Sequence, residues 1–376
     1  MPLTMPRTFR LGLRFSSRPR NLTFDRSLAI RRQFARSQHT ATDIPNAPVK
    51  AKRSSLRSIA ASLFFFGTGW ALNEHYKFIS FASPQPLNDL TFTPFTLKNK
   101  DTVSSTSAIF TLSQSHIPPG TFDDWWKKGV WSIEIKQPQL QIARAYTPLP
   151  PLYDSDPDAL RLLVRREQRG EVSGYIHRRP QGADLEVRGP AIEYELPDHV
   201  DQVVFLAGGT GIAPAIQVAH ALGDKACISV LWASRSREDC LGGQSDDPIT
   251  PAWYAAFARL FTNSQHHTVS HSGEKGLIVK QLDALKQSNP ALSVDYFVDE
   301  ESTYITPQNV RNAVASSSNQ PTNPGQGKKI ILVSGPEGFI NYWAGPKQWL
   351  NGREVQGPLG GALVHMNLKG WQVVKL

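Results

Sequence analysis

Two glycine-rich turns are the places where residue types and spacing most clearly indicate chemistry. GGTGIAP (208–214) follows the apolar run DQVVFLAGG, and SGPEGF (334–339) follows KIILV. Glycine between a strand and a helix lets backbone N–H groups and the helix dipole approach a phosphate. In an open parallel sheet, ligands bind across the carboxyl ends of the strands. The sequence therefore predicts a nucleotide site at this edge, although each turn alone is also compatible with an ordinary tight turn.

Two further motifs lie earlier in the chain. RAYTP (144–148) places Arg144 and Tyr146 on one face of a strand, with Thr147 at the strand's end before a proline. An arginine can bind a pyrophosphate bidentately, and a tyrosine ring can cover a flat heterocycle. GEVSGYI (170–176) brings glycine and serine to a helix start, where backbone N–H groups can hold another phosphate. The alternatives are a solvated strand face and a simple helix cap by Ser173.

The elements that position RAYTP and GEVSGYI are expected to be short apolar segments that precede residue 197. They are rich in Val, Ile, Leu, Phe and Thr, and they are separated by proline and glycine. Six short strands at such spacing predict a closed antiparallel barrel. The predicted strands lie near residues 92–98, 106–113, 130–137, 140–146, 159–166 and 184–188.

After Pro197, strand patterns and helix patterns alternate. DQVVFLAGG, CISVLWASR and KIILV are typical of buried strands, and PAIQVAHAL, WYAAFARLF and IVKQLDAL are typical of helices. This alternation predicts a parallel sheet with helices on both faces. The predicted fold class therefore combines α+β and α/β domains, with an antiparallel β-barrel followed by a parallel-sheet nucleotide-binding domain and preceded by an N-terminal membrane anchor.

The basic character of the chain is confined to its N-terminus. The whole chain has a formal net charge of +9, whereas residues 1–57 have 13 basic and two acidic residues and leave the remainder with a balance of −2. Such a body offers no general electrostatic surface for nucleic acid, so nucleic-acid binding is excluded. Cys227 and Cys240 form no CxxC motif and no Cys/His cluster, and no metal site is predicted.

Residues 1–40 have the composition of a mitochondrial transit peptide. Nine arginines occur between Arg7 and Arg36, with no lysine or glutamate and a single aspartate. A basic tail with no targeting role is the alternative. The run Arg32-Gln33-Phe34 before Ala35 is a candidate processing site.

An uncharged segment follows at residues 58–72. We expect a single transmembrane anchor over residues 58–76, with a helix lying in the membrane interface or a buried core helix as alternatives. Basic residues precede the segment, so the positive-inside tendency leaves the N-terminus in the matrix and the body in the intermembrane space.

Five motifs occur in the order and approximate spacing of the ferredoxin reductase superfamily, and the chain most resembles its cytochrome b5 reductase branch. The motifs are RAYTP, GEVSGYI, LEVRGP, FLAGGTGIAP and ILVSGPEGF. The resemblance implies an FAD-binding β-barrel over residues 90–196 and an NAD(P)-binding α/β domain over residues 200–345. A C-terminal extension, residues 346–376, follows. The implied cofactors are FAD and NAD(P)H.

The resemblance also implies a role for each motif residue. Arg144 would hold the FAD pyrophosphate, Tyr146 would pack on the isoalloxazine ring, and Thr147 would hydrogen-bond near its N5. Thr147, Thr210 and Ser334 are the implied catalytic residues. The other implied contacts are Gly170, Val172 and Ser173 with the phosphate and ribose of FAD, Gly208, Gly209 and Gly211 with the nucleotide, and Gly335 and Pro336 with the nicotinamide.

Two positions bear on the use of nicotinamide nucleotides. In ASRSRED (233–239), Ser234, Arg235 and Arg237 could take a 2′-phosphate and favour NADPH, and solvated surface charge is the alternative. Ser334 stands where these reductases commonly have cysteine. FAD binding is therefore implied more directly than nucleotide oxidation.

The presequence, the single anchor, the segment 130–151 and the Gly- and Trp-rich ending together resemble a smaller fungal group, the mitochondrial inner-membrane flavoproteins that assist haem attachment to c-type cytochromes. This resemblance implies an FAD-dependent NAD(P)H oxidoreductase that reduces haem iron in the intermembrane space. Its implied partners are haem, cytochrome c haem lyase, apocytochrome c and the inner mitochondrial membrane. The alternatives are a general cytochrome b5 reductase-like electron-transfer enzyme and a flavin-binding scaffold for the haem lyase.

Overall fold

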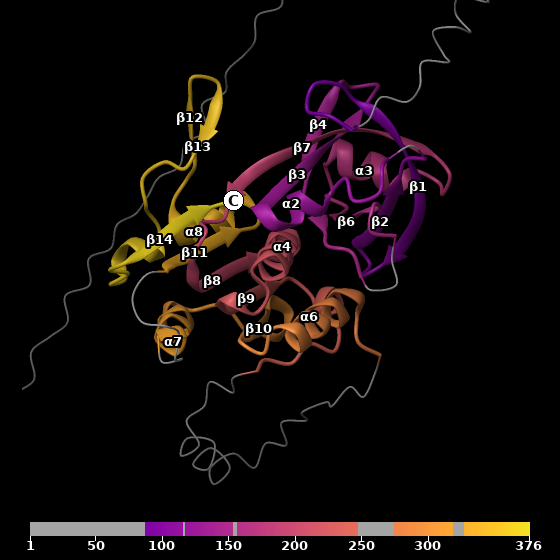
Figure 1. The fold of residues 1–376 in the computed structure, drawn as a ribbon. Coiled ribbons are helices and arrows are strands. Elements are labelled where there is room, and N and C mark those ends of the chain that lie inside the picture. Colours follow the sequence, from indigo (N-terminus) through magenta and orange to yellow (C-terminus); the bar gives the residue numbers. More distant parts are fainter. Residues whose placement is uncertain (1–86, 116, 153–155, 247–273, 319–326) are drawn as a thin grey trace, which may run out of the picture. The chain divides into compact units, whose positions relative to one another are not determined.

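The computed structural model describes five ranges of the chain, all within the unit Glu74–Leu376: residues 87–115, 117–152, 156–246, 274–318 and 327–376. The predicted transit peptide, the predicted anchor and the predicted helix at residues 253–261 lie outside these ranges. Within the described ranges, no helix has both the length and the apolar character needed to cross a membrane. The described chain forms two large sheets, each with its own helices (Figure 1).

The first domain is a seven-stranded sheet in which all neighbouring strands are antiparallel. The strand order is β4-β3-β7-β1-β2-β6-β5. Alternating apolar side chains fill its interior, where Phe95, Phe110 and Trp131 are fully buried. The strands are β1 (Thr93–Thr102), β2 (Ser107–Ser113), β3 (Gly129–Gln137), β4 (Ile142–Tyr146), β5 (Pro148–Leu149), β6 (Leu160–Arg165) and β7 (Asp184–Glu195).

The sheet closes on itself at Thr147. Its two edge strands, β4 and β5, are consecutive in the chain, and Thr147 alone separates them. Because neighbouring Cα atoms are about 3.8 Å apart, the two edges of the sheet must meet at this residue. The predicted antiparallel architecture of this domain is thus confirmed, with β5 as a seventh strand. Two residues are too few to give a sequence pattern, which explains why only six strands were expected.

Two helices complete the barrel domain. They are α2 (Asp123–Lys128) and α3 (Glu171–Arg178). Val172 and Ile176 lie one turn apart on α3 and are buried in the barrel core. This packing fixes the start of α3, and with it the loop that precedes the helix.

The second domain is a five-stranded parallel sheet with the order β10-β9-β8-β11-β14. Its predicted parallel architecture is confirmed. The strands are β8 (Val200–Gly208), β9 (Cys227–Ser234), β10 (Leu292–Val298), β11 (Lys328–Ser334) and β14 (Trp371–Lys375), and the helices are α4 (Ile212–Leu222), α6 (Leu277–Ser288), α7 (Pro307–Ser318) and α8 (Glu337–Ala344).

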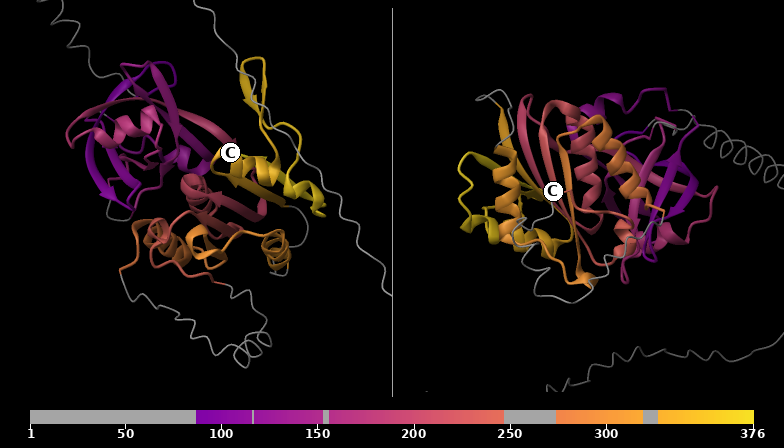
Figure 2. Two further views of the ribbon diagram at one scale, coloured as in Figure 1. Left: turned by 180° about the vertical axis from the view of Figure 1, so that it is seen from behind. Right: turned by 90° about the horizontal axis from the view of Figure 1, so that it is seen from below.

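Helices cover both faces of this sheet (Figure 2). Val203 and Phe205 of β8 share a core with α4 and α6, whereas Val204 and Leu206 share a second core with α7 and α8. Successive residues of a strand point to opposite faces, so a strand covered on both sides is apolar throughout. This arrangement accounts for the continuous apolar run that predicts β8.

Polar side chains join the two domains. Gln217 of α4 accepts a hydrogen bond from the Trp131 amide at 3.0 Å and donates to the carbonyl of Pro148 at 2.9 Å. Gln281 of α6 donates to the carbonyl of Pro150 at 3.1 Å. These bonds hold β3 and the segment from Pro148 to Pro150, at the end of RAYTP, against the parallel-sheet domain.

The segment after residue 345 contributes to the second domain. Its last strand, β14, lies beside β11, and the Leu376 amide donates to the carbonyl of Val333 at 2.8 Å. A short hairpin formed by β12 (Gln348–Leu350) and β13 (Arg353–Val355) projects from the same segment (Figure 1). The predicted extension is therefore part of the sheet and also carries a protruding arm.

Candidate functional site

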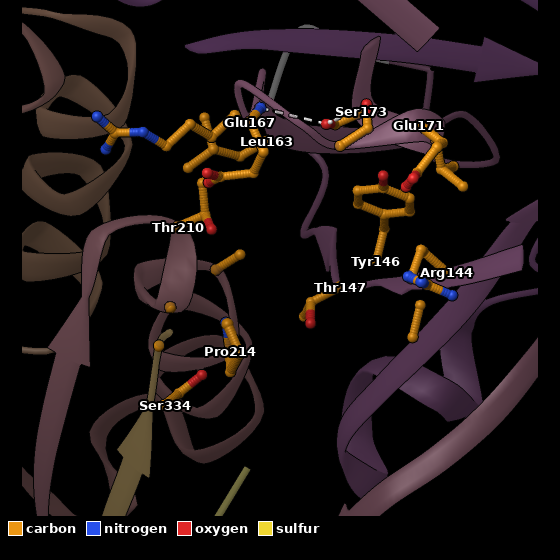
Figure 3. Close-up of a pocket in the computed structure, with 17 residues that line it drawn as sticks. Arg144, Tyr146, Thr147, Leu163, Glu167, Glu171, Ser173, Thr210, Pro214 and Ser334 are labelled. Atoms are coloured by element: carbon orange, nitrogen blue, oxygen red, sulfur yellow. Dashed lines mark hydrogen bonds between the residues drawn. The ribbon is translucent and has the colours of Figure 1, made fainter. Parts of the chain in front are cut away.

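A cavity of about 360 Å3 lies between the barrel and the parallel sheet (Figure 3). Its walls come from opposite domains. The barrel wall consists of Arg144, Ala145, Tyr146, Thr147, Leu163, Arg165, Glu167, Gly170, Glu171, Val172 and Ser173, and the sheet wall consists of Thr210, Gly211, Ala213, Pro214, Ser334 and Gly335.

Arg144 and Tyr146 lie on one face of β4. Tyr146 is opposite Ile133 of β3, and Arg144 is opposite Ile135. Arg144 is exposed, and its Nη1 donates to the neighbouring Ala143 carbonyl at 2.9 Å. Among the described residues, no ion pair involves Arg144. Its guanidinium thus keeps further donors for an anion beside the Tyr146 ring (Figure 3).

Burial raises the pKa of the Tyr146 phenol, and the charge of Arg144 opposes this shift. The phenol is therefore neutral at physiological pH, so the ring presents a flat, uncharged surface with one polar end. Thr147, half-buried where the barrel closes, also lines the cavity. The seam of the barrel thus places a hydroxyl group next to an aromatic ring.

The start of α3 forms another part of the barrel wall. Gly170 is the N-terminal cap of α3, with no side-chain hydrogen bond to the helix. The hydroxyl of Ser173 instead accepts a hydrogen bond from the Glu167 amide at 3.2 Å (Figure 3). A Cβ atom at position 170 would collide with this hydroxyl and lie 2.9 Å from Cβ of Glu167. Glycine is therefore required for the tight loop that precedes the helix.

The sheet wall is formed by two turns in direct contact. Strands β8 and β11 are neighbours, with Ala207 opposite Ser334. A Cβ at Gly211 would collide with the Ser334 carbonyl and lie 2.8 Å from the Gly335 nitrogen, and one at Gly335 would lie 3.0 Å from Cα of Gly208. The turns can touch only because side chains are missing, and the cavity is consequently bounded here by backbone and small groups.

The remaining expected nucleotide-turn residues support this wall from behind. Gly208 packs against the Phe339 ring, to which an added Cβ would come within 2.9 Å. The carbonyl of Gly209 accepts a hydrogen bond from Trp232 Nε1 at 2.9 Å, and Pro336 is the N-terminal cap of α8. None of these three residues is among those that line the cavity.

The expected 2′-phosphate residues are not brought together. Ser234 is buried, whereas Arg235 is exposed. Arg237 forms an ion pair with Glu301 and donates to the carbonyl of Gly243 at 3.1 Å. The hydrogen bond from Arg237 lowers the pKa of the Glu301 carboxyl. Arg237 is thus already neutralised within the fold, and neither Ser234 nor Arg235 lines the cavity.

Arg165 is a charged cavity residue that the motifs do not reveal. It ends β6, and its Nη1 lies 3.3 Å from a carboxylate oxygen of buried Asp239. Asp239 also accepts hydrogen bonds from Ser104 at 2.7 Å and Ser107 at 3.1 Å. Asp239 comes from the segment after β9 and the other three residues come from the barrel, so only the fold could show this cluster. The position of Arg165 at the end of an apolar strand was the available signal.

Comparison with known proteins identifies the barrel. Residues 94–196 match the family described as an oxidoreductase FAD-binding domain. An uncharacterised FAD-binding protein of Schizosaccharomyces pombe is 28% identical over 163 residues, which cover 43% of this chain and 58% of that protein. This chain therefore spans less than two thirds of that relative.

Two further relatives are similar to a larger part of the chain. The cytochrome c mitochondrial import factor CYC2 of Saccharomyces cerevisiae is 24% identical over 301 residues, covering 65% of this chain and 70% of that protein. An NADH-cytochrome b5 reductase 2 of Lodderomyces elongisporus is 26% identical over 194 residues, covering 49% of this chain and 61% of that protein.

These similarities confirm the predicted resemblance to fungal flavoproteins of the cytochrome b5 reductase type, including one named for cytochrome c. Residues 94–196 are therefore similar to the FAD-binding domain of oxidoreductases, and the chain is similar to the NADH-cytochrome b5 reductases.

Proposed function

We propose that the cavity between the two domains is the FAD site. In this proposal Arg144 pairs with the pyrophosphate, Tyr146 packs on the isoalloxazine ring and Thr147 hydrogen-bonds to its edge. Gly170, Val172 and Ser173, at the start of α3, hold the remaining phosphate and ribose. The observation that carries the proposal is the convergence of RAYTP, the start of α3 and both glycine-rich turns on one cavity.

The residues present fit such a group. The volume of about 360 Å3 lies within the range of about 300–1,000 Å3 for small-molecule sites. Arg144 has donors to spare for a phosphate, and the cradle at Gly170 leaves no room for a side chain. When bound there, FAD would supply the capacity for hydride acceptance from a nicotinamide nucleotide and for one-electron transfer. The protein would bind FAD, orient it and shield it from water.

The sheet wall is the proposed place of the nicotinamide. Gly211 and Gly335 permit close approach of a flat ring, and Thr210 and Ser334 offer hydroxyls on either side of it. Gly208, Gly209 and Pro336 do not line the cavity; in this proposal they shape the two turns that form its wall. Because Arg237 is paired with Glu301, Arg235 is the remaining cation at the end of β9 for an adenosine 2′-phosphate.

We further propose that the chain reduces haem iron in support of haem attachment to apocytochrome c. The similarity to a cytochrome c mitochondrial import factor over 65% of this chain supports this purpose. The site of action in the proposal is the inner mitochondrial membrane, with the described domains in the intermembrane space beside the haem lyase. The transit peptide and the anchor are predicted from sequence alone.

The full chain, mixed anaerobically with FAD, ferric haem and either NADH or NADPH, tests the enzymatic part. The expected result is nucleotide-dependent formation of ferrous haem, which is lost in Arg144→Ala. Ferric haem that persists with both nucleotides would contradict it. Cytochrome c levels in a strain carrying Arg144→Ala then test the biological part, since normal haem attachment would leave only a general electron-transfer enzyme.

Ser334 favours one other candidate, a flavin-containing scaffold for the haem lyase. Its side chain lines the cavity where related reductases commonly carry a thiol. A scaffold would hold FAD without bleaching when either nucleotide is added. The variant Ser334→Cys sharpens this test, because faster bleaching in the variant would show that the nucleotide reaches the wild-type site but reacts slowly.

A further inference from the structure

Exposed apolar side chains are concentrated in one short part of the chain. Large hydrophobic residues with at least 37% exposure occur at twelve described positions, and half of these lie between residues 342 and 364. Apolar groups gathered at a surface mark interaction sites more often than scattered ones do. The six residues are Tyr342, Trp349, Leu350, Val355, Leu359 and Val364.

The two most exposed of these six form the tip of the β12–β13 hairpin. Trp349 is 74% exposed and Leu350 is 61% exposed. The turn that follows uses Asn351 at φ 52° and Gly352 at φ 75°, values that suit a tight two-residue hairpin turn. Trp349 and Leu350 are adjacent, so they point to opposite faces of a ribbon that is bare on both sides.

The base of the hairpin is firmly attached to the nucleotide domain. Lys375 of β14 donates from Nζ to the carbonyls of Pro346 at 2.9 Å and Pro358 at 2.8 Å, one on each side of the hairpin. The side chain of Gln356 exchanges two hydrogen bonds with the Lys375 backbone, at 2.9 and 2.7 Å. An isolated two-stranded hairpin is only marginally stable. These bonds therefore hold an apolar tip in a fixed position.

The charges of the segment that carries the hairpin favour an anionic surface. Residues 342–370 contain two lysines and one arginine but a single acid, Glu354. That acid is paired with Lys347 at 3.0 Å. An exposed tryptophan and leucine together with surplus basic residues are typical of segments that lie in a membrane interface beside anionic headgroups.

The length of the chain limits how far the described domains can be from a membrane. The predicted anchor ends at residue 76, and the described chain begins at Leu87, which leaves ten residues between them. At no more than about 3.6 Å per residue, this connection spans about 36 Å or less. If the anchor spans the membrane, a connection this short keeps the described domains close to the lipid surface.

We propose that the β12–β13 hairpin is a second membrane contact, whose tip inserts Trp349 and Leu350 among the headgroups of an anionic bilayer. This contact sets the orientation of the flavin domains on the membrane to which the anchor holds them. The proposal rests on the predicted anchor and is independent of the flavin chemistry.

The test uses the full chain with a single environment-sensitive fluorophore on Leu350→Cys. The native Cys227 and Cys240 are buried, and burial raises the pKa of Cys240 to about 11, so the introduced thiol reacts selectively. A matched control carries the label on Tyr304→Cys. Tyr304 is 57% exposed and lies three residues before the start of α7, which is at the other end of the domain from the hairpin (Figures 1 and 2). Both proteins are reconstituted in phosphatidylcholine vesicles with a minority of phosphatidylglycerol and lipids that carry a quencher near the headgroup.

We expect a blue shift and strong quenching for the label at position 350, and a water-like, unquenched label at position 304. A label at position 350 that stays water-like, or equal quenching at both positions, would overturn the proposal. A label at position 350 that responds only when another protein is added would also overturn it. Trp349→Cys supplies a second labelled position, and the flavin absorption of each variant reports separately on the FAD site.

Discussion

The barrel wall of the cavity presents side chains, whereas the sheet wall presents mainly backbone. Arg144 extends from β4 with spare hydrogen-bond donors, and Tyr146, which packs partly against the barrel core, also lines the cavity. At Gly211 and Gly335 the backbone of the adjoining turn occupies the place of a side chain, so an added Cβ would collide with it. Removing atoms should therefore impair the barrel wall, and adding atoms should impair the sheet wall. The following variants test this contrast between the two walls.

Gly211→Val should have the largest effect. The added atoms would collide with the Ser334 carbonyl, which is backbone of the adjoining turn and cannot move without opening the sheet edge. We expect a loss of at least about 3 kcal/mol in the free energy of unfolding, at the upper end of overpacking costs. Gly338→Ala is the control, because nothing lies within 4 Å of its Cβ position in α8, and it should be neutral or slightly stabilising. Chemical denaturation of both variants measures the difference, and similar stabilities would refute the backbone contact.

Asp239→Asn should have the next largest effect, because Asp239 joins the two domains. The carboxylate accepts two serine hydroxyls and pairs with Arg165, all in a buried setting. Loss of its charge should cost about 2–3 kcal/mol of unfolding free energy. Asp124→Asn is the matched control, since its carboxylate is 85% exposed and its loss should cost under about 0.5 kcal/mol. Equal effects of the two variants would show that the cluster does not connect the domains.

Arg144→Ala should weaken FAD binding without weakening the fold. A charge-assisted pair contributes about 1.5–3 kcal/mol, so we expect FAD affinity to fall about 10- to 100-fold. The free energy of unfolding without FAD should be unchanged, since Arg144 is exposed and bonds only to its neighbour's carbonyl among the described residues. Titration with FAD measures the affinity, and Arg311→Ala at an exposed position of α7 is the control. Unaltered affinity in Arg144→Ala would remove the barrel wall from the FAD site.

The smallest effect is expected on acidification. Burial is the main cause that lowers the pKa of His177 in the barrel domain and of His220 in the parallel-sheet domain. Between the lowered folded pKa and the ordinary value of about 6.5, the unfolded chain binds more protons, so stability falls as the pH drops. Both groups are partly solvated, so each should contribute a few tenths of a kcal/mol at most. Urea unfolding at pH 7.5 and 5.5 should show a smaller pH effect in His177→Gln and in His220→Gln, and an unchanged effect in both would contradict these shifts.

The fold could be predicted from sequence where periodic patterns are long. Six barrel strands and the parallel sheet follow from alternation and from apolar runs such as that of β8. Strand β5 could not be predicted, because it has two residues and exists only where the barrel closes. The place of β14 beside β11 was also hidden, because a terminal strand after a long irregular segment gives no local sign of its neighbour.

The cavity could be predicted where the chain itself brings residues together. Four motif residues line it: Arg144 and Tyr146 share one face of β4, Thr147 follows the end of that strand, and Thr210 lies in a turn. Arg165 and Glu167 escaped notice, because their place in the cavity depends on how β6 is oriented toward the second domain. Conversely, Arg237 looked free in sequence, and its partner Glu301 lies 64 residues away. Long-range pairing of charges is set by the tertiary structure, which no local pattern encodes.

The most direct test of the central claim is the absorption spectrum of the purified full chain after incubation with FAD and removal of free cofactor. We expect a yellow protein with one FAD per chain, together with an Arg144→Ala variant that loses most of this colour and a Gly338→Ala control that keeps it. A colourless wild-type protein, folded by circular dichroism and unable to take up FAD, would contradict the assignment of the cavity.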